Sequence, residues 1–296
     1  MSIADVTREL LVRHLDVWTP AALHSAKRVT FVQAWAGEPD LAGAGAALRV
    51  FAEFADRLRG RQLTVVFIAA DTAGLSSRVD EVQAASGLPA ELNVHVVDGD
   101  GDERLPAALK AARAAGAPLL AYVDTAGTPP LRAIAAGRPA EALLLTPARD
   151  WSAHRAALTA AGFPLTAGVE LVDGADVRLV AMATSSAKSL EAFKNAMWAV
   201  DEYAGVRYRD PRDPESHLMD ISLNPNPGAL RRELLAHLAE VGERSVTDLR
   251  HYTLTDTIYR AEDTTRVLTN LLAAGAVTRR PERGRLSGDI IIAPAA

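Results

Sequence analysis

The stretch from Ala167 to Ala183, AGVELVDGADVRLVAMA, decides the fold. Ala167–Val172 and Val177–Ala183 are each predicted to be strands, because both are rich in apolar and β-branched residues. The residues between them, Asp173-Gly174-Ala175-Asp176, are typical of a tight turn joining two antiparallel strands. The sequence therefore predicts a β-hairpin at this point of the chain.

Five short apolar runs precede this hairpin and alternate with segments of helical periodicity. Strands that alternate with helices form a parallel sheet covered on both faces. We therefore expect an α/β fold with a doubly wound, Rossmann-like sheet that ends in an antiparallel hairpin. A plain dinucleotide-binding Rossmann sheet is the alternative, but it would lack the hairpin. The five runs are Val29–Ala34, Leu63–Ile68, Asn93–Val97, Leu119–Val123 and Ala142–Thr146.

The two ends of the chain differ from this alternating core. Residues 1–28 are predicted to form two helices, with Thr19-Pro20 as cap and first residue of the second. A further helix is expected over Ala187–Tyr203. The stretch Asn224-Pro225-Asn226-Pro227-Gly228 breaks regular structure, so we predict an α/β domain over 29–204, a linker over 205–228 and a separate domain over 229–296. Three helices followed by two strands in that last domain are typical of a winged helix.

Composition excludes several classes of protein. The 296 residues carry a net charge of −5, which argues against nonspecific coating of nucleic acid. The chain has no cysteine, which excludes disulfide scaffolds and thiolate metal sites and makes a cytoplasmic location the expectation. No apolar run approaches the ~18 residues of a membrane span, and the N-terminus lacks the apolar core of a secretory signal. We therefore expect no association with membranes.

Ligands of doubly wound sheets bind at the carboxyl ends of the strands, where the strand order reverses. After the first strand, Gly37 is the one glycine at a spacing suited to a cofactor loop, and a plain structural turn is an equal alternative. After the second strand, Asp71 is the candidate for binding the ribose hydroxyls of a cofactor. It stands two residues later in the chain than the acid that usually has this role. Capping of the following helix is its other interpretation.

The third and fourth strands are also followed by acids. Asp100 is the candidate for contacting an adenine amino group, whereas Asp102 is predicted to cap the next helix. A calcium loop at this place is excluded because Glu103 and Leu109 stand where its glycine and distal glutamate belong. Asp124 ends the apolar strand LLAYV, and we expect it to accept a proton or anchor a substrate. A turn cap on Thr128 is the alternative.

Other chemistries lack their residues. The seven histidines are scattered without metal-binding spacing, and the chain contains neither a G-x-S-x-G motif nor a Walker loop. In the expected winged helix, Glu262 and Asp263 open the helix that would enter a major groove, where they would repel phosphates. The arginines of the expected wing favour contact with a nucleic-acid backbone; they are Arg279, Arg280, Arg283 and Arg285.

Several motifs resemble the three-Cys-motif partner family (TcmP), whose members look like class I methyltransferases dependent on S-adenosylmethionine (SAM). FVQAWAG at 31–37 resembles the family's F-I-D-A-F-A-G, and VDTAG at 123–127 resembles its L-D-P-F-G. Gly99-Asp100 is similar to its G-D-A after the third strand. LEAFKNAMW at 190–198 is similar to its K-x-A-M-W helix, and TDTIYR at 255–260 to a segment of its C-terminal winged helix.

The resemblance implies SAM as a cofactor, Gly37, Asp100, Asp124 and Gly127 as site residues, and a radical-SAM-like three-Cys-motif protein as a partner. The chain departs from the family pattern at Gln33, Glu38-Pro39, Ala69 and Thr125-Ala126. These departures remove the acid and the glycine turn of the cofactor loop together. We therefore expect a catalytically impaired accessory or scaffold protein. The alternatives are an active SAM-dependent methyltransferase and a winged-helix regulator that binds nucleic acid.

Overall fold

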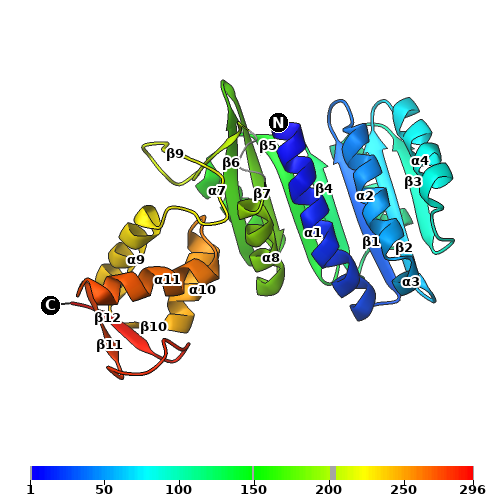
Figure 1. Cartoon of the computed structure of the whole chain (residues 1–296). Helices are drawn as coiled ribbons and strands as arrows, with labels where there is room; N and C mark the ends of the chain where they lie inside the picture. Colours follow the sequence, from blue (N-terminus) through cyan, green and yellow to red (C-terminus); the bar gives the residue numbers. More distant parts are fainter. Residues whose placement is uncertain (1, 149, 201–204, 296) are drawn as a thin grey trace. The chain divides into compact units, whose positions relative to one another are not determined.

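A computed structural model describes residues 2–148, 150–200 and 205–295. The chain divides into two compact units, Met1–Ile221 and Ser222–Ala296, called unit 1 and unit 2 below. Figure 1 shows the helices and strands of both. No helix in the described part of the chain is long and apolar enough to cross a membrane.

The core of unit 1 is a sheet with the strand order β3-β2-β1-β4-β5-β7-β6-β8-β9. The first five strands are parallel to one another, and β7 is inserted antiparallel between β5 and β6. The expected parallel sheet and hairpin are therefore present. The strands are β1 (Arg28–Trp35), β2 (Gln62–Ala69), β3 (Leu92–Asp98), β4 (Leu119–Asp124), β5 (Ala140–Pro147), β6 (Leu165–Asp173), β7 (Asp176–Thr184), β8 (Arg207–Arg209) and β9 (Leu218–Met219).

Helices cover both faces of this sheet. Figure 1 shows α8, α1, α2 and α4 side by side on one face. The other face packs on α5, α6 and α7, around an apolar core of alternate residues from the central strands. The helices are α1 (Ile3–Ser25), α2 (Leu41–Glu53), α3 (Ala55–Leu58), α4 (Ala73–Ser86), α5 (Gly101–Ala111), α6 (Leu131–Ile134), α7 (Trp151–Ala161) and α8 (Ala187–Trp198).

The prediction of two N-terminal helices is wrong, because α1 continues through Pro20 as one helix. A proline inside a helix removes a backbone hydrogen bond and normally favours a break. Here Leu15, Trp18 and Leu23, on both sides of the proline, are buried on the sheet. Burial of this continuous apolar face outweighs the local preference of the proline.

The expected helix over Ala187–Tyr203 is α8, which ends at Trp198; Tyr203 lies outside the described residues. The segment expected to be a linker instead contributes β8 and β9 to the sheet. Tyr208 anchors it: its side chain is fully buried, its ring meets Trp198 edge-on, and its hydroxyl donates to the Met197 carbonyl at 2.7 Å. Val206 and Ile221 of the same segment are buried as well.

Unit 2 contains three helices and an antiparallel sheet with the order β10-β12-β11. Its helices α9 (Gly228–Val241), α10 (Val246–Asp256) and α11 (Ala261–Ala273) bury one leucine-rich core. The strands are β10 (Arg244–Ser245), β11 (Val277–Arg280) and β12 (Ile291–Pro294). The two strands expected at the end of this domain are present as β11 and β12, whereas β10 was not predicted.

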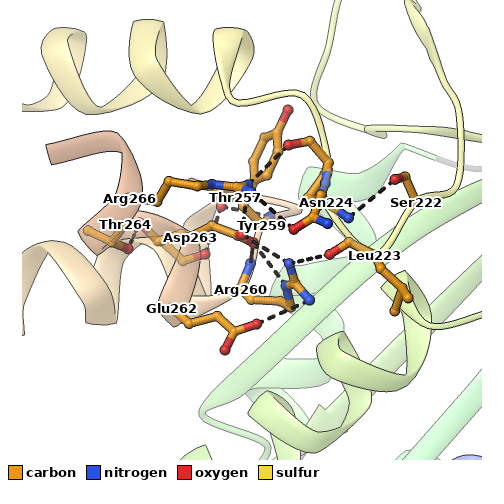
Figure 2. A network of polar contacts seen from close by, with 12 residues as sticks. Ser222, Leu223, Asn224, Thr257, Tyr259, Arg260, Glu262, Asp263, Thr264 and Arg266 are labelled. Carbon is orange, nitrogen blue, oxygen red and sulfur yellow. Dashed lines mark hydrogen bonds and ion pairs between the residues drawn. The ribbon is translucent and has the colours of Figure 1, made fainter. Parts of the chain in front are cut away.

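Residues Ser222–Pro227, which we call the strap, belong to unit 2 and are held by the N-terminal end of α11 (Figure 2). Arg260 donates to the Leu223 carbonyl at 2.9 Å, and Arg266 donates to the Pro225 carbonyl at 3.1 Å. The Tyr259 hydroxyl donates to the Asn226 carbonyl at 3.0 Å. The Asn-Pro repeat that was expected to separate two domains is thus a bound part of the second unit.

Candidate functional site

The strand order reverses between β1 and β4, and the carboxyl ends of strands at such a point are where doubly wound sheets bind ligands. Trp35 and Asp124 are paired in register at these ends, and the Ala36 amide donates to the Asp124 carbonyl at 2.9 Å. The structure therefore places Asp124 at the switch point of the sheet.

The Asp124 carboxylate forms an ion pair with Arg178, with 2.5 Å between Oδ1 and Nη2. Arg178 lies near the start of β7, opposite Pro147 at the end of β5. Both side chains are about one-third exposed. Partial burial raises the pKa of Asp124 above its ordinary value, and the charge and hydrogen bond of Arg178 oppose this rise. The pairing replaces the Thr128 cap that was the alternative for Asp124.

Arg178 was not predicted as a site residue, because it lies 54 positions after Asp124 in the sequence and on the far side of a turn. The signal that could have revealed it is the strand register. An antiparallel strand inserted beside β5 returns its first residues to the carboxyl edge of the parallel strands. A charged residue at the start of that strand therefore lies beside the acid that ends β4.

Tyr122 lies below Asp124 on the same face of β4, because side chains two apart on a strand share a face. Burial raises the pKa of the Tyr122 phenol, and the nearby Asp124 carboxylate raises it further, while a hydrogen bond with the Thr7 side chain lowers it. A second ion pair lies nearby: Arg8 of α1 binds Asp40 with Nη2 and Oδ1 3.1 Å apart. Two arginine–aspartate pairs thus lie near a buried phenol at this edge of the sheet.

The two acids after β3 do not divide the roles as expected. The Asp100 side chain caps α5 by accepting from the amides of Asp102 at 2.9 Å and Glu103 at 3.1 Å. The prediction that Asp102 is the cap is wrong. Asp102 Oδ2 instead accepts from the Thr125 hydroxyl at 2.5 Å, and Thr125 Oγ1 accepts from the Gly127 amide at 2.8 Å. These bonds tie the start of α5 to the loop after β4.

The remaining candidates make local contacts. Asp71 is exposed, and its Oδ1 accepts from the Ala73 amide at 3.1 Å, while the N-cap position of α4 itself is occupied by Thr72. A side chain at Gly37 would meet no atom within 4 Å, so no contact within the chain requires glycine there. At Gly127 a Cβ atom would come within 2.9 Å of Asp102 Oδ2.

The contact between α5 and β1 was not predicted from the sequence. A Cβ atom on Gly101 would come within 2.9 Å of the Trp35 carbonyl oxygen, so the helix packs directly on the end of the strand. Trp35 itself is buried and lies against Phe67 with ring centroids 6.2 Å apart. Gln33, which stands at the family's acid position, is buried, and its Oε1 has no partner among the described residues.

Comparison with known proteins found no matching family model and no matching curated protein. Solved structures with partial similarity include EvdMO1, at 15% identity over 61% of this chain and 42% of that chain, with a TM-score of 0.38. The METTL16 MTase domain matches at 14% identity over 57% of this chain and 65% of that chain, with a TM-score of 0.34. A predicted O-methyltransferase from Agrobacterium tumefaciens matches at 17% identity over 56% and 79%, with a TM-score of 0.29.

This chain spans less than two thirds of the length of the first two of these structures. Its strand order and strand directions define the class: unit 1 is a mixed α/β unit built on one large sheet, in which five parallel strands are followed by antiparallel ones.

Proposed function

We propose that the chain is a methyltransferase-like accessory or scaffold protein of the three-Cys-motif partner type, with impaired SAM-dependent catalysis. The observation that carries the proposal is the set of hydrogen bonds that joins the loops after β3 and β4 at the carboxyl edge of the sheet. Asp100 caps α5, and Asp102, Thr125 and Gly127 are joined by hydrogen bonds that connect two of the loops expected to hold the cofactor.

The residues at this edge do not fit SAM well. A ribose acid is missing at Ala69, and Asp71 stabilises the start of a helix. The family's acid is replaced by the buried Gln33, whose carbonyl oxygen has no partner among the described residues. Glu38 is exposed in the loop where the glycine turn is expected, and its charge would repel the carboxylate of SAM. We therefore derive no reaction step through this cofactor.

Isothermal titration calorimetry with SAM tests the proposal on the full chain. We expect no binding at micromolar concentrations of SAM, and the same for S-adenosylhomocysteine. A dissociation constant in the micromolar range or tighter would contradict the accessory role and support an enzyme. Asp124→Asn serves as a matched variant, because binding that depends on Asp124 would place the ligand at the β1–β4 crevice.

A second candidate function is an active methyltransferase, and Asp124 favours it. Its carboxylate lies at the switch point, remains partly exposed and has a raised pKa, as a group that accepts a proton from a substrate requires. In that case Asp124→Asn should lower turnover ~100-fold. If the accessory proposal holds, the same variant should bind its protein partner as the wild type does.

For unit 2 we propose a winged helix that contacts protein more readily than nucleic acid. The strap covers the end of α11 that would enter a major groove. Asp263, expected to repel phosphates, is instead buried between Arg260 and Arg266. Glu262 still presents its charge there, since its side chain is 63% exposed.

The arginines of the expected wing are partly engaged as well. Arg279 donates to the carbonyls of Pro281 and Gly284, each at 3.0 Å, and Arg280 pairs with Glu243 at 2.5 Å. Fluorescence anisotropy with labelled duplex DNA and RNA tests this part of the proposal. Binding at physiological salt that is lost in an Arg283→Glu, Arg285→Glu variant would favour the nucleic-acid alternative.

The resemblance to the three-Cys-motif partner family also proposes a partner. Co-expression with a radical-SAM-like three-Cys-motif protein and size-exclusion chromatography should give a stable complex. Separate elution of the two proteins at micromolar concentrations would contradict that partnership.

A further inference from the structure

A hollow of about 260 Å³ lies at the amino edge of the sheet, near the points where β1 and β2 begin. Its wall consists of Pro20, Leu23 and His24 from the second half of α1, together with Arg57 and Arg61 in and after α3. Figure 1 shows the last turns of α1 and the short α3 at the same end of unit 1. The hollow is therefore separate from the carboxyl edge of β1 and β4 described above.

The polar part of this wall is entirely basic. Three of the five lining residues carry a basic side chain, and none of the five carries an acid. The other two, Pro20 and Leu23, give the wall an apolar part. A ligand that fits this wall therefore combines a negative charge with a small apolar body.

Neither arginine of the wall has a counter-ion in the described part of the chain. Arg57 makes neither a hydrogen bond nor an ion pair with any described residue, and its guanidinium lies over the Phe54 ring, 5.8 Å from the centroid. Arg61 donates through Nη1 to the Ala26 carbonyl at 2.8 Å, which holds its guanidinium beside the end of α1. Most N–H groups of the two guanidinium groups are therefore available to a ligand.

The segments around the hollow add to its positive charge. Residues 24–28 and 54–62 contain five lysine and arginine side chains and one acid, in a chain whose net charge is −5. The two segments lie side by side, because the Gln62 amide donates to the Lys27 carbonyl at 2.7 Å. The five cations are Lys27, Arg28, Arg57, Arg59 and Arg61, and the acid is Asp56.

Cations are common at the ends of helices, but two helix ends do not account for this many. Helix α1 ends at Ser25 and α2 ends at Glu53, and each helix end acts as about −0.5 of an elementary charge. Even when the Glu53 carboxylate is counted as well, an excess of about two positive charges remains. This excess is free to attract an anion.

We propose that the hollow binds the phosphate group of a small phosphate monoester. Such a group carries a charge of about −1.5 to −2 at neutral pH, which matches the excess of positive charge. The planar fork of an arginine binds two phosphate oxygens at once, and the wall contains two arginines. The volume of about 260 Å³ lies below the range of sites for drug-sized ligands, so the apolar body against Pro20 and Leu23 is small.

Ligand-observed NMR of the full chain with phenyl phosphate tests the proposal, because this probe joins a phosphate monoester to one small apolar ring. We expect saturation transfer to the phenyl protons and a dissociation constant in the low millimolar range or tighter, as suits so small a ligand. Benzoate has the same ring but a single charge, and it should bind about fivefold more weakly or less. Equal binding of benzoate would overturn the assignment to phosphate.

Variants of the arginines locate the binding. Arg57→Gln and Arg61→Gln should each weaken binding of phenyl phosphate about tenfold, since each removes charge-assisted hydrogen bonds. Arg59→Gln removes the same charge from the same segment, but Arg59 pairs with Asp56 at 3.0 Å and does not line the hollow. Its effect should therefore stay below about twofold. If Arg61→Gln fails to fold without its bond to Ala26, Arg57→Gln decides the test.

Two other results overturn the proposal. The first is no binding at about 20 mM phenyl phosphate, a concentration well above the expected dissociation constant. The second is an equal loss of affinity in Arg57→Gln and Arg59→Gln, which would show a diffuse attraction without a site. A single-stranded oligonucleotide is the last probe: if it binds while phenyl phosphate does not, the cations serve a polymer of phosphodiesters, contrary to the proposal.

Discussion

The carboxylate of Asp124 and the guanidinium of Arg178 lie 2.5 Å apart at the carboxyl edge of the sheet, although they come from strands of opposite direction. Arg178 Nε is buried without a partner among the described residues, so the pair leaves one of its own donors unused. The ion pair therefore does not satisfy the polar groups of the crevice completely. This is the strongest argument for a ligand or substrate at this place.

Asp124→Asn is expected to keep or raise the free energy of unfolding at neutral pH. The pKa of Asp124 is raised in the folded state, so the ionised form is disfavoured there relative to the unfolded chain. The stability that Asp124 contributes is present at pH values below its pKa in the unfolded chain. It is lost as the pH rises through the pKa of Asp124 in the folded protein. Urea unfolding at intervals from about pH 4 to 7 should show this loss in the wild type and not in the variant.

Two variants serve as comparisons for this experiment. Asp56→Asn removes an acid from an exposed ion pair with Arg59 and should change stability by less than about 0.5 kcal/mol. Arg178→Gln removes the cation that lowers the pKa of Asp124. The free energy of unfolding of this variant should therefore fall more steeply with rising pH than that of the wild type. A loss of stability in Asp124→Asn at pH 7 would show that pairing with Arg178 outweighs burial.

Thr125→Val is expected to destabilise unit 1 by about 1–3 kcal/mol, whereas Thr125→Ser should have a much smaller effect. The Thr125 side chain is buried, and valine keeps its shape while removing the hydroxyl. Asp102 then loses the hydrogen bond from Thr125, and the Gly127 amide loses the one that it donates to Thr125 Oγ1. Urea denaturation of the three proteins measures the difference. Equal stabilities of the valine and serine variants would mean that the hydroxyl does not connect the two loops.

His14 and Glu141 form a buried pair between α1 and β5, with Nε2 and Oε2 2.9 Å apart. We expect His14→Leu and Glu141→Leu each to cost about 3–5 kcal/mol, because each leaves a buried polar partner without its counterpart. The double variant should be clearly more stable than the sum of the two losses predicts. A double-mutant cycle by urea unfolding measures this coupling. Additive losses would contradict it.

The sequence predicted the central strands well, since buried strands are short apolar runs that stand out against their surroundings. It also predicted the hairpin from the turn Asp173-Gly174-Ala175-Asp176, which joins β6 and β7. These features depend on local composition. The single helix α1 was missed because Thr19-Pro20 is a local signal that a long buried face overrides.

The candidate site was harder to predict for a related reason. Asp124 was found because it ends an apolar strand, but its partner Arg178 depends on the strand register. The capping residue of α5 was assigned to Asp102 when Asp100 performs that role, because two acids at alternate positions offer the same local signal. The strap was not predicted because it is held through its backbone carbonyl groups. Every residue has such a group, so the sequence of the strap gives no sign of these contacts.

Asp263→Ala should release the strap from α11. The Asp263 carboxylate is 3% exposed and accepts from Arg260 through Nε and Nη2, each at 3.0 Å. It also accepts from Arg266 at 3.1 Å. Without it, the Arg260 guanidinium is left in a buried position without this counter-ion, at a cost of about 3–5 kcal/mol. The same two arginines hold the Leu223 and Pro225 carbonyls, so the strap loses its anchors.

Hydrogen–deuterium exchange over residues 222–228 measures this release directly, because an amide exchanges faster when its segment opens locally. The wild-type strap should exchange slowly for a proline-rich segment, and Asp263→Ala should speed its exchange while α9 remains protected. Glu262→Gln is the matched control: that side chain is 63% exposed, so its pairing with Arg260 contributes less than about 1 kcal/mol. Fast exchange in the wild type would instead favour the linker that was expected over 205–228 for this part of the chain. Equal effects of the two variants would show that burial of Asp263 is not what holds the strap.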